Sequence, residues 1–131
     1  MFVQNLNERQ QSALLYYADA VMRADNTVEA SELIAMDIIR SQCHKGVQPN
    51  EIPIDQLPKI FTTRMGRVSF LLELVGMAYV NDDFDRREFK LIYQISDALD
   101  LSEDGSLEAI LKWVKDQLGL MKRAKTLMEE S

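Results

Sequence analysis

The sequence contains very little of the chemistry that most enzymes and metalloproteins need. Among its 131 residues there are only one cysteine and one histidine. A single cysteine excludes an internal disulfide, and the adjacent pair Cys43 and His44 is too small a set for a conventional zinc site. Nucleophile–base pairs and triads are excluded unless one of these two residues takes part, and no phosphate loop or cofactor fingerprint is present. We therefore expect a protein that is not an enzyme.

Helix-breaking residues and long apolar runs are also scarce. There are five glycines and three prolines, and all three prolines lie in residues 49–58. The longest apolar stretch, residues 68–80, is interrupted by polar residues and is shorter than the roughly 20 residues that a membrane helix needs. The first residues do not have the pattern of a secretory signal. We expect a cytoplasmic protein without membrane insertion.

The chain has more acidic than basic residues. Fifteen basic residues against 21 acidic ones give a formal charge of −6, so phosphate backbones repel the chain and we expect no nucleic-acid partner. Residues 106–129 depart from this balance because they carry Lys112, Lys115, Lys122, Arg123 and Lys125. A charge distribution of this kind favours electrostatically guided binding to a protein partner.

Apolar residues recur at helical spacing along almost the whole chain. This periodicity predicts a single all-α domain over residues 1–131, with helices over 7–24, 30–44, 63–80, 86–99 and 106–129 and a short turn near 55–60. Asn7 and Gln10 have the spacing of a capping box, and Gly119 is expected to break the last helix. The side chains expected to face the core include Leu33, Ile34, Met36, Ile38, Ile39, Met65, Met77 and Met121.

Two stretches of the sequence resemble each other. Residues 24–33 (ADNTVEASEL) and 80–89 (VNDDFDRREF) each follow one apolar helix and precede another. The types of residue match in order: a short polar pair, a bulky apolar residue, an acid and then a glutamate. The sequence thus predicts two helix–acidic loop–helix repeats.

The acids of the repeats have two interpretations. In the first they cap helices, because Glu32 follows Glu29, and Glu88 follows Asp85, by three residues, and acids in a first turn also favour the helix dipole. In the second they bind a hard cation such as Ca²⁺ or Mg²⁺ through oxygen ligands. Two EF-hand loops are excluded, since Val21 and Met77 would occupy a ligating position that needs an oxygen-bearing side chain. A cation site would require the two repeats to pool their carboxylates.

The motif resembles that of the TerB-like (tellurite resistance protein B) family of small helical bacterial proteins, in which Ala-Asp-Gly and a later Glu occur twice. Here the first copy is Ala24-Asp25-Asn26 with Glu32, and the second is Val80-Asn81-Asp82 with Glu88. Asn26 and Asp82 stand where the family has Gly, and Asn81 replaces the second Asp.

This resemblance implies a compact bundle of about seven helices in two halves related by pseudo-symmetry. It also implies an acidic surface that binds a divalent metal, and a role in stress-response complexes that associate peripherally with the membrane. The candidate metal ligands are Asp25, Glu32, Asn81, Asp82 and Glu88. The alternative function is a purely structural or adaptor module that binds proteins without metal.

Overall fold

The computed structural model describes residues 1–80 and 86–129, and every regular element in these residues is helical. The α-helices are α1 (Glu8–Arg23), α2 (Ala30–Gln42), α3 (Leu57–Ile60), α4 (Arg64–Ala78), α5 (Arg86–Ala98) and α6 (Ser106–Glu129). Two 3₁₀ turns, η1 (Val3–Asn5) and η2 (Ile54–Gln56), precede α1 and α3. The all-α prediction is confirmed for the described residues, which contain six α-helices rather than about seven.

Polar side chains define where the two central helices begin. The Asn7 side chain accepts a hydrogen bond from the Gln10 amide at 2.9 Å, and the Gln10 side chain accepts one from the Asn7 amide at 2.9 Å. This is the capping box that the sequence predicts for α1. At the start of α4, the Thr63 hydroxyl accepts from the Gly66 amide at 3.1 Å. Both caps satisfy amides that would otherwise have no partner in the first helical turn.

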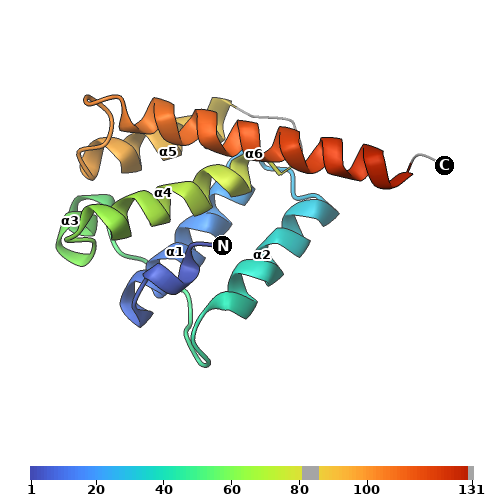
Figure 1. Ribbon diagram of the computed structural model, residues 1–131. Coiled ribbons are helices and arrows are strands. Elements are labelled where there is room, and N and C mark those ends of the chain that lie inside the picture. Colours follow the sequence, from blue (N-terminus) through green and yellow to red (C-terminus); the bar gives the residue numbers. More distant parts are fainter. Residues whose placement is uncertain (81–85, 130–131) are drawn as a thin grey trace.

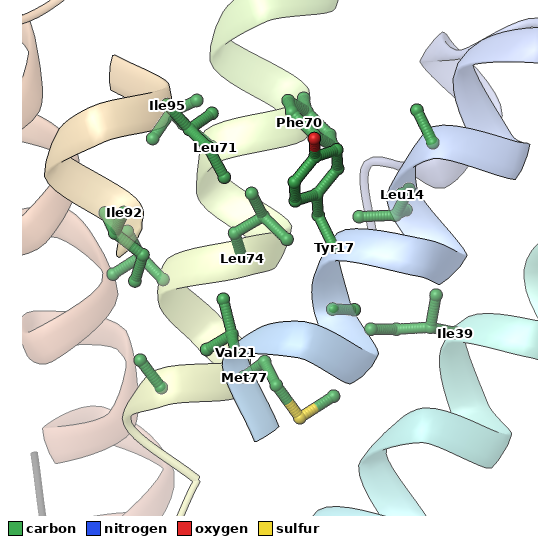
Figure 2. Close-up of a cluster of buried hydrophobic side chains, with 14 of the residues drawn as sticks. Leu14, Tyr17, Val21, Ile39, Phe70, Leu71, Leu74, Met77, Ile92 and Ile95 are labelled. Atoms are coloured by element: carbon green, nitrogen blue, oxygen red, sulfur yellow. The ribbon is translucent and has the colours of Figure 1, made fainter. Parts of the chain in front are cut away.

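The core lies between α1 and α4, which pack against each other more extensively than any other pair of described helices (Figure 1). Figure 2 shows Tyr17 and Val21 of α1 facing Phe70 and Leu74 of α4, with α5 closing the other side of α4. Phe70 stacks on Phe61 with ring centroids 4.3 Å apart. The Tyr17 ring meets Phe70 edge-on at 6.3 Å. Such aromatic contacts add stability beyond the burial of apolar area.

The helix boundaries repeat at the offset of the sequence motif. Helices α1 and α4 begin at residues 8 and 64, and α2 and α5 end at residues 42 and 98. The interval is the same in each of these pairs. The capping residues Asn7 and Thr63 are separated by that interval as well. The two hairpins α1–α2 and α4–α5 therefore have matching lengths and matching starting points.

Several predictions about the core and the helix ends are wrong. On α2 only Met36 and Ile39 are buried among the apolar residues, whereas Leu33, Ile34 and Ile38 are exposed, since α2 packs mainly on α1 and shows the opposite face to solvent. Met65 and Met121 are also exposed, at the first turn of α4 and near the end of α6. Gly119 does not interrupt α6, which is continuous from 106 to 129.

Candidate functional site

The first acidic elbow, residues 24–29, joins α1 to α2. Asn26 adopts a left-handed backbone conformation with φ of 64°, which asparagine tolerates better than most residues. The carboxylate of Asp25 accepts a hydrogen bond from the amide of Thr27 at 2.9 Å. This side-chain-to-backbone turn holds the elbow tight, so that one Asp25 oxygen serves local structure.

Glu32 is the third residue of α2, and its side chain is turned inward. Only 2% of the residue is exposed. Its Oε1 atom accepts a hydrogen bond from the Glu29 amide at 3.0 Å, which is the contact that the capping interpretation predicts. Glu32 therefore stabilises the start of α2 whether or not it has a second role.

Glu88 occupies the equivalent place in the second repeat. It is the third residue of α5, it is also 2% exposed, and its Oε2 atom is enclosed. The two glutamates at the same helical position of the two repeats are thus both buried. The other predicted ligands of this repeat, Asn81 and Asp82, and the predicted cap Asp85, lie outside the described residues.

An arginine connects the two repeats. The Arg87 guanidinium donates a hydrogen bond to the backbone carbonyl of Asp25 at 3.1 Å, although the two residues lie far apart in the sequence. Sequence reasoning missed this residue, because Arg87 falls at a variable position of the motif and nothing in the spacing indicates a contact. The bond brings the start of α5 next to the first elbow and adds a positive charge beside the acids.

The oxygen atoms of the candidate ligands suit a hard cation, but the described residues are not arranged as a complete cation site. Carboxylate oxygens are the ligands that Ca²⁺ and Mg²⁺ prefer, and Ca²⁺ takes six to eight of them. Among residues 1–80 and 86–129, no group of three or more His, Cys, Asp or Glu side chains is arranged to hold an ion. Asp25, Glu32 and Glu88 therefore do not form a site by themselves, and a complete one would need ligands from Asn81 and Asp82.

The cysteine and the histidine lie away from the elbows, after α2. Cys43 is partly buried, and burial raises the pKa of its thiol, an effect that the nearby Arg40 charge opposes. A raised pKa lowers the fraction of nucleophilic thiolate at neutral pH. The His44 ring nitrogen Nδ1 lies 3.3 Å from a carboxylate oxygen of Glu8 at the exposed start of α1.

Comparisons with protein-family models, with curated proteins and with solved structures find no match to this chain. Within the part of the chain that the structure describes, no helix has both the length and the apolar character needed to cross a membrane.

Proposed function

We propose that this protein is a non-enzymatic helical module of the TerB-like kind, whose paired acidic elbows bind a divalent cation, a protein partner, or both. The net charge of −6 supports a protein partner rather than a nucleic acid. A place in a stress-response complex at the membrane periphery is implied by the same resemblance, and it belongs to this proposal together with a cytoplasmic location.

The repeat is supported by the helix boundaries. A duplicated hairpin with pseudo-symmetry should start and end its helices at a constant offset. The starts of α1 and α4 and the ends of α2 and α5 have this offset. The burial of Glu32 and Glu88 at the same helical position follows the same offset. These matches support two related halves, as the TerB-like resemblance implies.

The observation that carries the proposal is the hydrogen bond from Arg87 to the Asp25 carbonyl. A shared site requires the acidic loops of the two repeats to be neighbours. This bond supports that requirement, because it joins Asp25, in the first elbow, to the first turn of α5, which follows the second acidic loop in the sequence.

The cation proposal is supported by the burial of the two glutamates. Removing a carboxylate from water is costly unless hydrogen bonds or a positive charge compensate for it. Glu32 accepts a hydrogen bond from the Glu29 amide, and the Arg87 guanidinium lies beside the first elbow. A Ca²⁺ or Mg²⁺ ion held by Asp25, Glu32 and Glu88 together with Asn81 and Asp82 would add the compensation that such a cluster favours.

The alternative function is an adaptor module without metal. The hydrogen bond from the Glu29 amide to Glu32 supports it, because that bond gives the buried carboxylate a structural role. Under this alternative the elbows present a fixed surface to a protein, and no ion is needed.

A titration with Ca²⁺ and Mg²⁺, monitored by amide chemical shifts and by calorimetry, distinguishes the cation-binding module from the adaptor module without metal. Cation binding should shift the amides of Asp25, Glu32 and Glu88 and raise the melting temperature. Glu32→Gln and Glu88→Gln keep a hydrogen-bond acceptor but remove the charge, and they should abolish these shifts. Glu103→Gln, at an exposed turn before α6, is the matched control and should bind as the wild type does. Unchanged spectra at millimolar metal would reject the cation and leave the adaptor alternative.

A further inference from the structure

The last described part of α6 extends beyond the body of the protein. The helix is anchored by Leu107, Ile110 and Val114, and residues 120–129 are all exposed. Figure 1 shows this part of α6 running past the other helices toward the C-terminal label. We call residues 120–129 the arm. At about 1.5 Å per residue the arm reaches about 15 Å from the body.

The arm has an apolar stripe that no described residue of its own chain covers. Its apolar residues follow the spacing i, i+1, i+4, i+7 and i+8, which places them on one helix face: Leu120, Met121, Ala124, Leu127 and Met128. Its four large apolar side chains are between 57% and 79% exposed. A short helix that lacks tertiary contacts is marginally stable in water, so a stripe of this width favours a partner.

A second exposed apolar surface lies on α2. Ile34 and Ile38, one turn apart, are 60% and 52% exposed. Ile38 also lines a groove of about 150 Å³ between α2 and α4, whose other lining residues include Met77 and Val80. We call Ile34, Ile38 and this groove the α2 face.

The charges around the two surfaces are complementary. Residues 120–129 contain three basic side chains and one acid, whereas residues 25–42, which include α2, contain four acids and one base. Asp37 and Glu29 are the exposed acids on this stretch. Opposite charge beside two apolar surfaces favours their association and fixes its orientation.

We propose that two copies of this chain associate reciprocally, with the arm of each lying on the α2 face of the other. Such an arrangement has two-fold symmetry and covers both apolar surfaces at once. The charge of the chain favours a second copy over an anionic lipid surface as the partner of the arm. Because the rest of the chain is acidic, it repels an anionic membrane but attracts the basic arm of another copy. The proposal does not require a bound metal ion.

Sedimentation velocity on the full chain tests the proposal. The wild type should form a dimer at micromolar concentrations that weakens as salt is raised. Leu127→Asp in the arm and Ile38→Asp on the α2 face should each raise the dissociation constant at least about tenfold, which corresponds to about 1.4 kcal/mol. Met65→Asp, an exposed position outside both surfaces, is the matched control and should leave the dimer unchanged.

Zero-length carbodiimide cross-linking of mixed isotopically light and heavy chains tests the contact without any variant. Links between Lys122 or Lys125 of one copy and Glu29 or Asp37 of the other are expected. A wild type that stays monomeric at high micromolar concentration overturns the proposal. A dimer that Ile38→Asp leaves intact also overturns it, since the arms would then pair with each other. So does an arm that binds anionic vesicles while the protein remains monomeric.

Discussion

The guanidinium of Arg87, in the first turn of α5, donates a hydrogen bond to the backbone carbonyl of Asp25 in the first acidic elbow. The sequence motif singles out Asp25, whereas nothing in the sequence singles out Arg87. The contact matters because its partners belong to different repeats, so only the packing of the α4–α5 hairpin against the α1–α2 hairpin can bring them together.

Arg87→Ala should remove the hydrogen bond between α5 and the first elbow. Because the bond is exposed, we expect a loss of less than about 1 kcal/mol in the free energy of unfolding. The more specific effect is a change in the chemical shift of the Asn26 amide, which follows the Asp25 carbonyl directly. Arg86→Ala, at the neighbouring exposed position of α5, is the control. Equal effects of the two variants at Asn26 would mean that the bond does not hold the elbow.

Gln11 should be far more important for stability than a surface glutamine. It is fully buried, and it donates to the Leu6 carbonyl at 3.0 Å while accepting from the His44 amide at 2.8 Å. Gln11→Ala would leave both backbone groups without their partner, and we expect a cost of about 1–3 kcal/mol in urea denaturation. Gln4→Ala, at an exposed position, should cost almost nothing. A similar midpoint for both variants would contradict this role.

Arg67 has the equivalent role in the second hairpin, at the position that corresponds to Gln11 in the first. Its guanidinium donates to the Phe61 carbonyl at 2.7 Å and to the Leu99 carbonyl at 3.2 Å. In both hairpins, one polar side chain on the first helix therefore joins the preceding segment to the end of the second helix. Arg67→Met should destabilise the protein in urea denaturation comparably to Gln11→Ala. Arg67→Lys should restore only part of the loss, because lysine lacks the planar fork.

Phe70→Ala should be among the most destabilising single changes. Phe70 is fully buried between Phe61 and Tyr17, so truncation removes apolar burial and leaves a cavity in the centre of the core. We expect a loss of about 3–5 kcal/mol, measured by urea denaturation. Met65→Ala on the same helix removes an exposed side chain and should have a small effect. Equal losses in the free energy of unfolding for Phe70→Ala and Met65→Ala would contradict the central position of Phe70 in the core.

Tyr17 should make stability fall at alkaline pH. Burial, with smaller contributions from Tyr16 and the acids Glu51 and Asp55, raises the pKa of Tyr17 to about 12. An unfolded chain loses the same proton near pH 10. The contribution of Tyr17 is therefore complete below about pH 10 and is lost as the pH rises toward 12.

Tyr17→Phe isolates this effect. The Tyr17 hydroxyl donates to the Ile52 carbonyl, so the variant removes both the bond and the titrating group. We expect it to cost about 1 kcal/mol at neutral pH and to flatten the alkaline fall in stability. Tyr93→Phe, at an exposed site on α5, is the control. An alkaline profile that Tyr17→Phe leaves unchanged would assign the fall to other groups.

The sequence predicted the helices well and their faces less well. Caps and periodicity placed the starts of the long helices at or next to their observed first residues, because both signals are local. On α2, apolar residues occur on more than one side, and only the position of its neighbours decides that Met36 is buried and Ile34 is exposed. The prediction that Gly119 interrupts α6 was wrong, because a glycine in a helix interior costs only about 1 kcal/mol relative to alanine.

For the acidic motif, the sequence predicted the equivalence of two glutamates but not their surroundings. The spacing of the motif located Glu32 and Glu88 at equivalent positions, and the structure buries both. The contact of Arg87 with Asp25 could not be predicted, since it depends on how the two hairpins pack. The function of the elbows stays a prediction for the titration to test.

The pairing of α1 with α4 has a consequence for synthesis on the ribosome. The face of α1 that carries Leu14 and Tyr17 has its main cover on α4, where Phe70 follows only in the second half of the chain. A nascent chain that has emerged only as far as α2 therefore exposes this apolar face until the second hairpin follows. Translation pauses between residues 42 and 64 should increase its dependence on chaperones, because long-range contacts must wait for their sequence to appear.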